Sequence, residues 1–408
     1  MIQPLEGVRI LAVEQYGAGP FGTQHLADMG AEVIKIENPR DGGDVGRSVG
    51  PHFLDNGDSL FFEGFNRNKK SIQLDLKQAD GIAVFHRLVR QADVVFNNLR
   101  GDQPQKLGLT YAALADIRKD IVCAHLSAYG REGSRADWPG YDYLMQAEAG
   151  YLSLTGEPDG PPTRFGLSIV DLMTGTTAAL GIVSALLAAK RSGKGMDVDV
   201  SLFDVAIHNM VYLATWYLNA GYMTTRAPMS AHPSLVPSQL YKTKDGWIFI
   251  MCNKEKFWPL MAGLMGHPEW ADRPEYKTFA DRLKNREKFN NEIGAVFLTE
   301  TTDSWMDKFA GKVPAAPVYD VAQALDNPFV AERRGIVGGK RRKDAVLNPA
   351  SPEEVKAVAS PLRFSRDDVD VQPEMRAAPG LGEHTDEVLR NAGFSEEQIE
   401  FLKQKKVI

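Results

Sequence analysis

Two features of the sequence could support chemistry: a glycine-rich turn and an isolated aspartate. Gly17, Gly19 and Gly22 form a Gly-x-Gly-x-x-Gly pattern between an apolar run and a helical stretch, with Glu37 twenty residues after Gly17. In a dinucleotide site such glycines allow a tight turn beside a pyrophosphate, and the acid binds ribose hydroxyls. Three interpretations stay open: a nicotinamide or flavin site, a site for another phosphate-bearing ligand, and close packing of a helix on a sheet.

The isolated aspartate, Asp171, stands directly before a long uncharged stretch, where we expect a helix N-cap. An N-cap aspartate accepts hydrogen bonds from backbone N–H groups and is favoured by the helix dipole. The neighbouring Thr174 and Gly175 would also leave room for a substrate, so that the carboxylate could act as a nucleophile. From these residues alone, both a cap and a nucleophile remain open.

The composition argues against several other classes of function. The sequence contains no HExxH, no EF-hand spacing and no close His/Cys cluster, and its two cysteines are Cys123 and Cys252, so we expect no metal site. With 53 acidic and 47 basic residues the net charge is −6, which offers no electrostatic reason to bind nucleic acid. We expect the basic residues 340–343 to form a solvated loop. The first residues lack the features of a signal peptide, so we expect a cytoplasmic protein.

The residues that could do chemistry lie among alternating strand-like and helix-like segments. Apolar runs at 8–13, 33–36, 71–76, 93–96 and 121–127 predict strands, and helical patterns reach residue 29 and cover 79–91. This alternation predicts an α/β fold with a mostly parallel sheet. The stretches 172–189 and 205–225 carry no charge, but they are too polar for membrane spans, so we expect two buried helices.

The pattern changes near residue 225, which suggests a second domain. A hairpin is expected at 240–243 and 247–252, with helices near 257–265, 286–297 and 304–309, and two further helices end the chain near 386–391 and 396–403. A chain of 408 residues exceeds the roughly 250 to 300 residues of a single core. We expect a large domain at 1–224, ending in a linker helix at 203–224, a smaller α+β domain at 225–329, and a segment at 330–408 that returns to the large domain.

Stretches along the whole chain match one enzyme family in order and spacing: PLEGVRIL (4–11), AGP (18–20), LADMGAEVIKIENP (26–39), GD (43–44), NRNKKSIQLDLK (66–77), KLGL (106–109), PGYDYLMQAEAG (139–150), TGEPDGPPTR (155–164), VDLMTG (170–175), GKGMDVDVSLFD (193–204), DGW (245–247), PAAPV (314–318) and LGEHTDEVL (381–389). On these stretches the sequence resembles the class III CoA-transferase family, also called the CaiB/BaiF family. The resemblance implies a Rossmann-like large domain, a smaller α+β domain and an interlocked, ring-like homodimer. It also implies that the glycine turn faces CoA rather than NAD.

The resemblance implies a catalytic role for Asp171. Its carboxylate would attack an acyl-CoA thioester to give a mixed anhydride, and would then carry CoA as an aspartyl-CoA thioester until a small carboxylic acid, dicarboxylic or hydroxy, accepts it. CoA is then a substrate, and no prosthetic group is implied. The CoA contacts implied by position are Gly17, Ala18, Asn38, Leu74, Lys77, Asn98, Leu99, Lys106 and Tyr141.

Other activities remain as alternatives. One branch of the family racemises 2-methylacyl-CoA thioesters with a histidine at the position of Tyr141. A tyrosine hydroxyl, whose ordinary pKa is about 10, is a poor reversible acid and base near neutral pH, so we favour the transferase over the racemase. An NAD-dependent oxidoreductase is a more remote alternative. Oxalate-specific members carry a glycine run where this chain reads SAHPSLVP at 230–237, which argues against oxalate, and we expect His232 in that segment to be structural.

Overall fold

The computed structural model describes residues 3–55, 57–342, 353–366, 369–371 and 375–408. The chain divides into two compact units. Unit 1 contains Met1–Ala149, Phe165–Val211 and Phe329–Ile408, and unit 2 contains Gly150–Arg164 and Tyr212–Pro328. Residues 150–164 and 212–224, which we expected in the large domain, therefore lie in unit 2, whereas the C-terminal residues belong with the N-terminal half.

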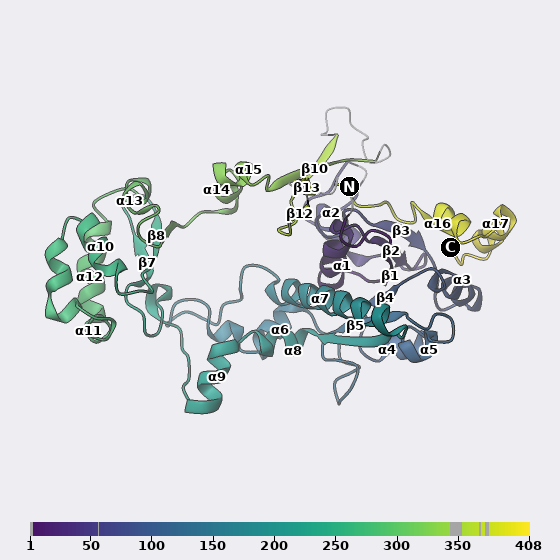
Figure 1. Cartoon of the computed structure of the whole chain (residues 1–408), viewed down its shortest axis with the longest axis horizontal. Helices are drawn as coiled ribbons and strands as arrows, with labels where there is room; N and C mark the ends of the chain where they lie inside the picture. Colours follow the sequence, from purple (N-terminus) through teal and green to yellow (C-terminus); the bar gives the residue numbers. More distant parts are fainter. Residues whose placement is uncertain (1–2, 56, 343–352, 367–368, 372–374) are drawn as a thin grey trace. The chain divides into compact units, whose positions relative to one another are not determined.

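A six-stranded parallel sheet forms the centre of unit 1 (Figure 1). Its order is β3-β2-β1-β4-β5-β6, and every neighbouring pair is parallel. The order reverses between β1 and β4, and open α/β sheets bind ligands beyond the carboxyl ends of the strands at such a point. The prediction of an α/β fold with a parallel sheet is confirmed. The strands are β1 (Arg9–Val13), β2 (Glu32–Glu37), β3 (Lys70–Gln73), β4 (Val94–Asn97), β5 (Val122–Ser127) and β6 (Met196–Ser201).

Two helices of unit 1 approach each other closely because both carry glycine at the contact. These are α1 (Ala18–Asp28) and α7 (Ile169–Ser192). A Cβ on Gly22 would lie 2.6 Å from the carbonyl oxygen of Gly175, and a Cβ on Gly175 would lie 2.5 Å from that of Ala18. Gly22, the third glycine of the Gly-x-Gly-x-x-Gly pattern, therefore allows α1 and α7 to pack closely. The other helices of unit 1 are α2 (Leu60–Asn66), α3 (Ala79–Val89), α4 (Gln103–Lys106), α5 (Tyr111–Leu114), α6 (Asp142–Glu148) and α8 (Leu202–His208).

The two uncharged stretches behave differently. By length and composition α7 could cross a membrane, but it packs on α1, β5 and β6 in the manner of a core helix, as expected. The expectation of a second buried helix over 205–225 is wrong. After α8 the chain turns at Val211, whose φ of 38° is left-handed. Val211 is the first residue of α9 (Val211–Ala220), which has no buried residue. Among the described residues, Tyr212, Tyr217 and Leu218 of α9 are exposed.

The C-terminal residues pack against the open edge of the sheet beside β3. In α16 (Thr385–Asn391) and α17 (Glu396–Gln404), Leu389 and Ile399 join a buried cluster with Ile72 and Phe85. The N–H of Asp75 donates to the carbonyl oxygen of Val407 at 2.8 Å. Two short antiparallel pairs precede these helices: β10 (Ile336–Lys340) with β11 (Glu354–Val358), and β12 (Phe364–Arg366) with β13 (Val369–Val371).

The expected solvated loop at 340–343 is not formed by its described residues, 340–342. Lys340 ends β10, and Arg341 and Arg342 form ion pairs with Asp55 and Asp58. The side chain of Arg341 is almost fully buried, because these pairs join the C-terminal segment to the loop before α2. Residue 343 lies outside the described residues.

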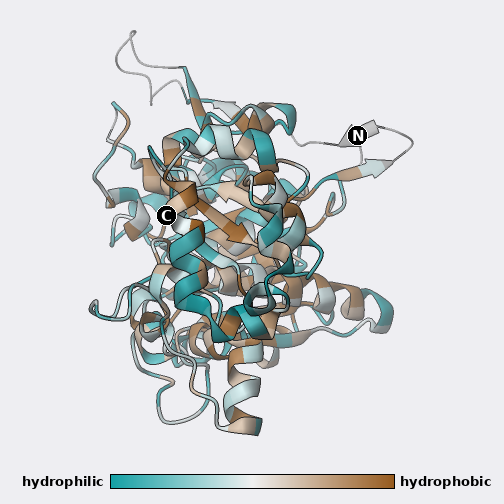
Figure 2. Ribbon diagram, turned by 90° about the vertical axis from the view of Figure 1, so that its left-hand side faces the viewer, coloured by the Kyte–Doolittle hydropathy of each residue, from teal (hydrophilic) through white to brown (hydrophobic). Residues whose placement is uncertain are grey.

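Unit 2 has its own small sheet and aromatic core. Strands β7 (Ser238–Lys242), β8 (Trp247–Met251) and β9 (Ala315–Pro317) are antiparallel, and Ile248, Trp258, Phe289 and Trp305 are buried together. Figure 2 shows hydrophobic residues on strands that lie behind a helix with a hydrophilic outer face. The helices are α10 (Phe257–Leu264), α11 (Phe279–Lys284), α12 (Arg286–Phe297), α13 (Thr302–Phe309) and α14 (Val321–Leu325), and α15 (Pro328–Glu332) follows at the return to unit 1.

Candidate active site

Two hollows adjoin in unit 1 at the carboxyl ends of β1 and β4. Their volumes are about 280 and about 200 Å³, and Gln15 and Leu99 line both of them. They lie where the strand order reverses, which is the expected binding position in this type of sheet. A long ligand could therefore lie in both hollows at once.

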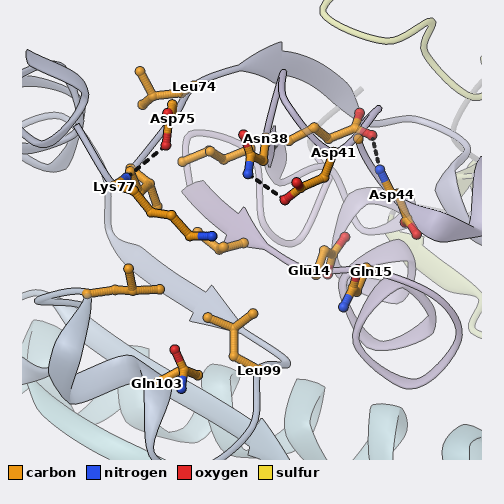
Figure 3. A pocket seen from close by; sticks show the side chains of 16 residues that line it. Glu14, Gln15, Asn38, Asp41, Asp44, Leu74, Asp75, Lys77, Leu99 and Gln103 are labelled. Atoms are coloured by element: carbon orange, nitrogen blue, oxygen red, sulfur yellow. Dashed lines mark hydrogen bonds between the residues drawn. The ribbon is translucent and has the colours of Figure 1, made fainter. Parts of the chain in front are cut away.

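The larger hollow is lined by Asn38, Leu74, Lys77 and Leu99, four of the expected CoA contacts (Figure 3). The side chain of Lys77 extends into it, and its ammonium group forms no ion pair with any described residue. The amide of Asn38 is instead engaged locally, since its Nδ2 donates to Asp41 at 2.5 Å. Lys77 is thus the side chain of this hollow best suited to meet a phosphate group.

The smaller hollow contains the rest of the expected site, with one exception. Gly17, Ala18, Asn98, Tyr141 and Asp171 line it together with Leu99. Lys106 lines neither hollow, because its Nζ lies 2.5 Å from Asp102 in an exposed ion pair one turn away along α4. The structure therefore brings together all of the expected site residues except Lys106.

Asp171 is the third residue of α7, so its expected N-cap position is wrong. The helix starts earlier, with Ser168 at the N-cap, and the N–H of Asp171 donates to the carboxylate of Asp142 at 2.9 Å. Only 7% of Asp171 is exposed. Its carboxylate lies directly over Gly17, where a Cβ would stand 2.8 Å from Oδ2. A larger residue than glycine would force the carboxylate away from the turn.

The surroundings of Asp171 make its carboxylate hard to ionise. Burial raises its pKa to about 7, and the negative charge of Asp142 adds to the shift. Both effects disfavour the charged form, since the ion loses water and lies near a like charge. Once ionised, such a weakly solvated carboxylate is well suited to nucleophilic attack, and strongly shifted pKa values are typical of functional sites.

The turn that carries Gly17 is held by buried charges that the sequence analysis missed. The Nζ of Lys35 lies 2.7 Å from Asp44 Oδ2, and both side chains are fully buried. The other oxygen of Asp44 accepts the N–H of Tyr16 at 2.8 Å. Tyr16 has a φ of 69°, a left-handed conformation that is unfavourable for an aromatic residue. A signal was present in the sequence, because Lys35 interrupts the apolar run at 33–36 and a buried lysine requires a partner.

Asn98 holds the same turn from the neighbouring strand. Its Oδ1 accepts the N–H of Gln15 at 2.9 Å, and its Nδ2 donates to the carbonyl oxygen of Gln15 at 2.7 Å. A Cβ on Gly19 would stand 2.7 Å from this side chain. Asn98, which we expected to contact CoA, therefore uses its amide to position the turn.

Two further expectations concern His232 and metal ions. His232 belongs to unit 2, where its Nδ1 accepts the N–H groups of Ser234 and Leu235 at 3.2 and 3.1 Å, contacts that agree with the structural role we expected. Within the described part of the chain, no group of three or more His, Cys, Asp or Glu side chains could hold a metal ion.

Comparisons with known proteins agree over nearly the whole chain. The model of CoA-transferase family III matches residues 5–385. A succinate–glutarate CoA-transferase from Agrobacterium fabrum is 33% identical over 397 residues, 95% of each chain. A succinyl-CoA–D-citramalate CoA-transferase from Chloroflexus aurantiacus is 33% identical over 412 residues, which cover 100% of this chain and 98% of that protein. Among solved structures, a CAIB/BAIF family protein from Brucella suis has a TM-score of 0.82 at 30% identity, covering 96% of this chain and 100% of that one.

The environment of Asp171 predicts that Asp171→Asn stabilises the protein at alkaline pH. The pKa of an aspartate is about 3.9 in an unfolded chain, whereas that of Asp171 is about 7 in the fold. The folded state therefore holds an extra proton between these values, and wild-type stability falls as the pH rises from about 4 to 7. A shift of about three pKa units corresponds to about 4 kcal/mol at most.

Urea denaturation at pH 4.5 and pH 8 measures this difference. We expect the variant to exceed the wild type in unfolding free energy at pH 8 and to approach it at pH 4.5. The exposed Asp116 supplies the matched control, Asp116→Asn, which should follow the wild type at both pH values. A constant difference between Asp171→Asn and wild type across this range would contradict the buried-carboxylate account.

Proposed function

This chain belongs to CoA-transferase family III, and from that premise we propose that it transfers CoA from an acyl-CoA to a small carboxylic acid through an aspartyl-CoA thioester on Asp171. The observation that carries the proposal is the buried carboxylate of Asp171, which lies against Gly17 at the wall of the smaller hollow. A carboxylate is required, because an amide or a hydroxyl could not form an anhydride that preserves the free energy of a thioester.

The proposed reaction consists of four exchanges at acyl carbons. The Asp171 carboxylate attacks the thioester carbonyl and expels the CoA thiolate, which leaves a mixed anhydride. The thiolate attacks the aspartyl carbonyl of this anhydride and releases the donor acid, so that CoA becomes bonded to Asp171. The acceptor carboxylate then attacks the aspartyl thioester and expels the thiolate again. Finally the thiolate attacks the acceptor carbonyl and regenerates Asp171. Acyl-CoA is a substrate, and no prosthetic group enters these steps.

We place the two ends of CoA in the two adjoining hollows. The nucleotide end would lie in the larger hollow, where Lys77 extends a free ammonium group toward its phosphates. The thiol end would pass Gln15 and Leu99 to reach Asp171. This placement agrees with the rule that ligands bind beyond the strand ends at the reversal of strand order.

We propose a small dicarboxylic or hydroxy acid as the acceptor, with an acyl-CoA such as succinyl-CoA as the donor. The names of two full-length relatives support this class, since one is a succinate–glutarate CoA-transferase and the other a succinyl-CoA–D-citramalate CoA-transferase.

The alternative activities receive less support from the residues at the site. A racemase would need an acid and base at the position of Tyr141, and a tyrosine serves poorly near neutral pH. A nicotinamide site would need the glycine turn to face a pyrophosphate. In this chain Gly17 faces Asp171 and Gly22 packs on α7 instead. We therefore retain the transferase.

We also propose that two copies of the chain form an interlocked homodimer. On α9 the side chain of Leu218 is 77% exposed, and on α7 that of Leu180 is 67% exposed. Apolar helix faces of this kind require cover, which a second copy would supply.

Mixing tagged and untagged dimers tests the interlocking. Linked rings cannot exchange subunits without unfolding, so tagged and untagged chains should stay in separate dimers after long incubation in native buffer and should mix after denaturation and refolding. Sedimentation as a monomer at nanomolar concentration, or rapid exchange in native buffer, would contradict the proposal.

Intact-mass spectrometry tests the covalent intermediate. Wild-type protein incubated with succinyl-CoA should gain the mass of CoA on the peptide that contains Asp171, and hydroxylamine should remove it. Asp171→Asn should form no adduct and should lose roughly four orders of magnitude or more in transfer rate, as is usual when a nucleophile is removed. The exposed Asp116→Asn should retain both the adduct and the activity. Normal transfer by an Asp171→Asn sample free of wild-type and deamidated protein would show that Asp171 is not the nucleophile.

A further inference from the structure

An acceptor acid has to bring its carboxylate up to the aspartyl-CoA thioester on Asp171, if the proposed function holds. A carboxylate that enters a site partly removed from water loses part of its hydration and needs compensating hydrogen bonds. The smaller hollow therefore needs hydrogen-bond donors for the incoming acid. The cationic side chain among its lining residues is Arg100, and its guanidinium already donates to both oxygens of Asp102, at 2.6 and 3.0 Å.

Several polar groups of the smaller hollow are already engaged within the protein. The side-chain amide of Asn98 accepts a hydrogen bond from the N–H of Gln15 and donates one to its carbonyl oxygen. The hydroxyl oxygen of Ser127 accepts the N–H of Gly130 at 2.9 Å. The hydroxyls of Tyr16 and Tyr141, which both line the hollow, make no hydrogen bond to any of the residues that the structure describes. Of the two, Tyr16 is the less exposed residue, at 36% against 62%. An uncommitted donor thus lies one residue before the glycine that touches Asp171.

The position of Tyr16 is maintained at a conformational cost. A left-handed φ is unfavourable for a residue other than glycine and persists where the surroundings enforce it. Here the enforcing contact is the hydrogen bond to Asp44, which the buried Lys35 holds in place. The ring is also fixed from two sides, since its centroid lies 5.3 Å from that of Phe61 and 6.0 Å from that of Tyr141.

The chemistry of the Tyr16 side chain suits a donor to an anion. Burial raises its pKa, and the charge of Asp171 raises it further. The hydroxyl therefore keeps its proton at the pH at which Asp171 is ionised. A neutral O–H adds no charge to the hollow, yet its hydrogen bond to a carboxylate is of the stronger, charge-assisted type.

We propose that the Tyr16 hydroxyl donates a hydrogen bond to the reacting carboxylate of the acceptor acid, in front of Asp171. Tyr16 is then a specificity-determining residue that selects carboxylate acceptors and compensates for the hydration that they lose in the hollow. The inference rests on the proposed function and names the group that recognises its acceptor.

The decisive variant is Tyr16→Phe, since phenylalanine keeps the ring and adopts the left-handed backbone as reluctantly as tyrosine does. Loss of a hydrogen bond to a charged group corresponds to a tenfold or greater change in affinity. With succinyl-CoA as donor, we expect the KM for glutarate and for acetate to rise about tenfold or more. Formation of the aspartyl-CoA adduct from succinyl-CoA alone should stay close to the wild-type rate. The matched control is Tyr111→Phe, whose hydroxyl bonds to the carbonyl oxygen of Lys119 and lines neither hollow.

The outcomes separate this inference from the function on which it rests. A normal adduct with unchanged acceptor KM in Tyr16→Phe would overturn the inference and leave the proposed function intact. A loss confined to glutarate would assign the hydroxyl to the distal carboxylate and would likewise overturn it, as would an equal fall in adduct formation and acceptor use. Absence of the adduct in wild-type protein would instead contradict the proposed function itself.

Discussion

The contact between the Asp171 carboxylate and the main chain at Gly17 is the constraint on which the rest of the structure depends. Because Gly17 has no Cβ, the carboxylate can lie close to the turn and lose most of its water. That loss raises its pKa to about 7 and makes the group costly to ionise within the fold. A carboxylate held in this way is reactive once it is ionised, and the neighbouring elements have to keep it in this position.

Each neighbouring element contributes to holding this contact. The turn enters at the reversal of strand order, where Asn98 at the end of β4 fixes the main chain of Gln15. Lys35 and Asp44 hold the strained Tyr16 from inside the fold. On the other side, Gly22 allows α1 and α7 to approach closely, and α7 carries Asp171. Displacement of any one of these contacts would shift the carboxylate relative to the turn.

Much of this fold could be predicted from the sequence because its elements obey simple periodicities. The apolar runs of β1, β2, β4 and β5 and the amphipathic α3 were recognisable, since buried parallel strands and half-exposed helices produce distinct patterns. The prediction for the stretch at 205–225 was wrong because burial depends on which elements pack against a helix, and the sequence of the helix does not show this. Its composition is that of a buried helix, but the described part of the chain buries no residue of α9.

The site was harder to predict, because its key features depend on tertiary contacts. Asp171 lines the smaller hollow with the other expected residues, but the expected cap was wrong, since α7 begins at Ile169 with Ser168 as its N-cap. The expected CoA contact Lys106 lies instead in an ion pair with Asp102. The role of Tyr16 follows from a backbone angle and a buried ion pair that no local sequence pattern encodes.

The central claim is that CoA lies in both hollows with its sulfur at Asp171. A crystal structure of the protein frozen during turnover of succinyl-CoA tests this claim most directly. The account predicts continuous density from the Asp171 carbonyl carbon through the CoA sulfur, past Gln15 and Leu99, to a nucleotide whose phosphates lie near Lys77. A CoA molecule bound with its sulfur far from Asp171, or with its nucleotide outside the larger hollow, would contradict the account.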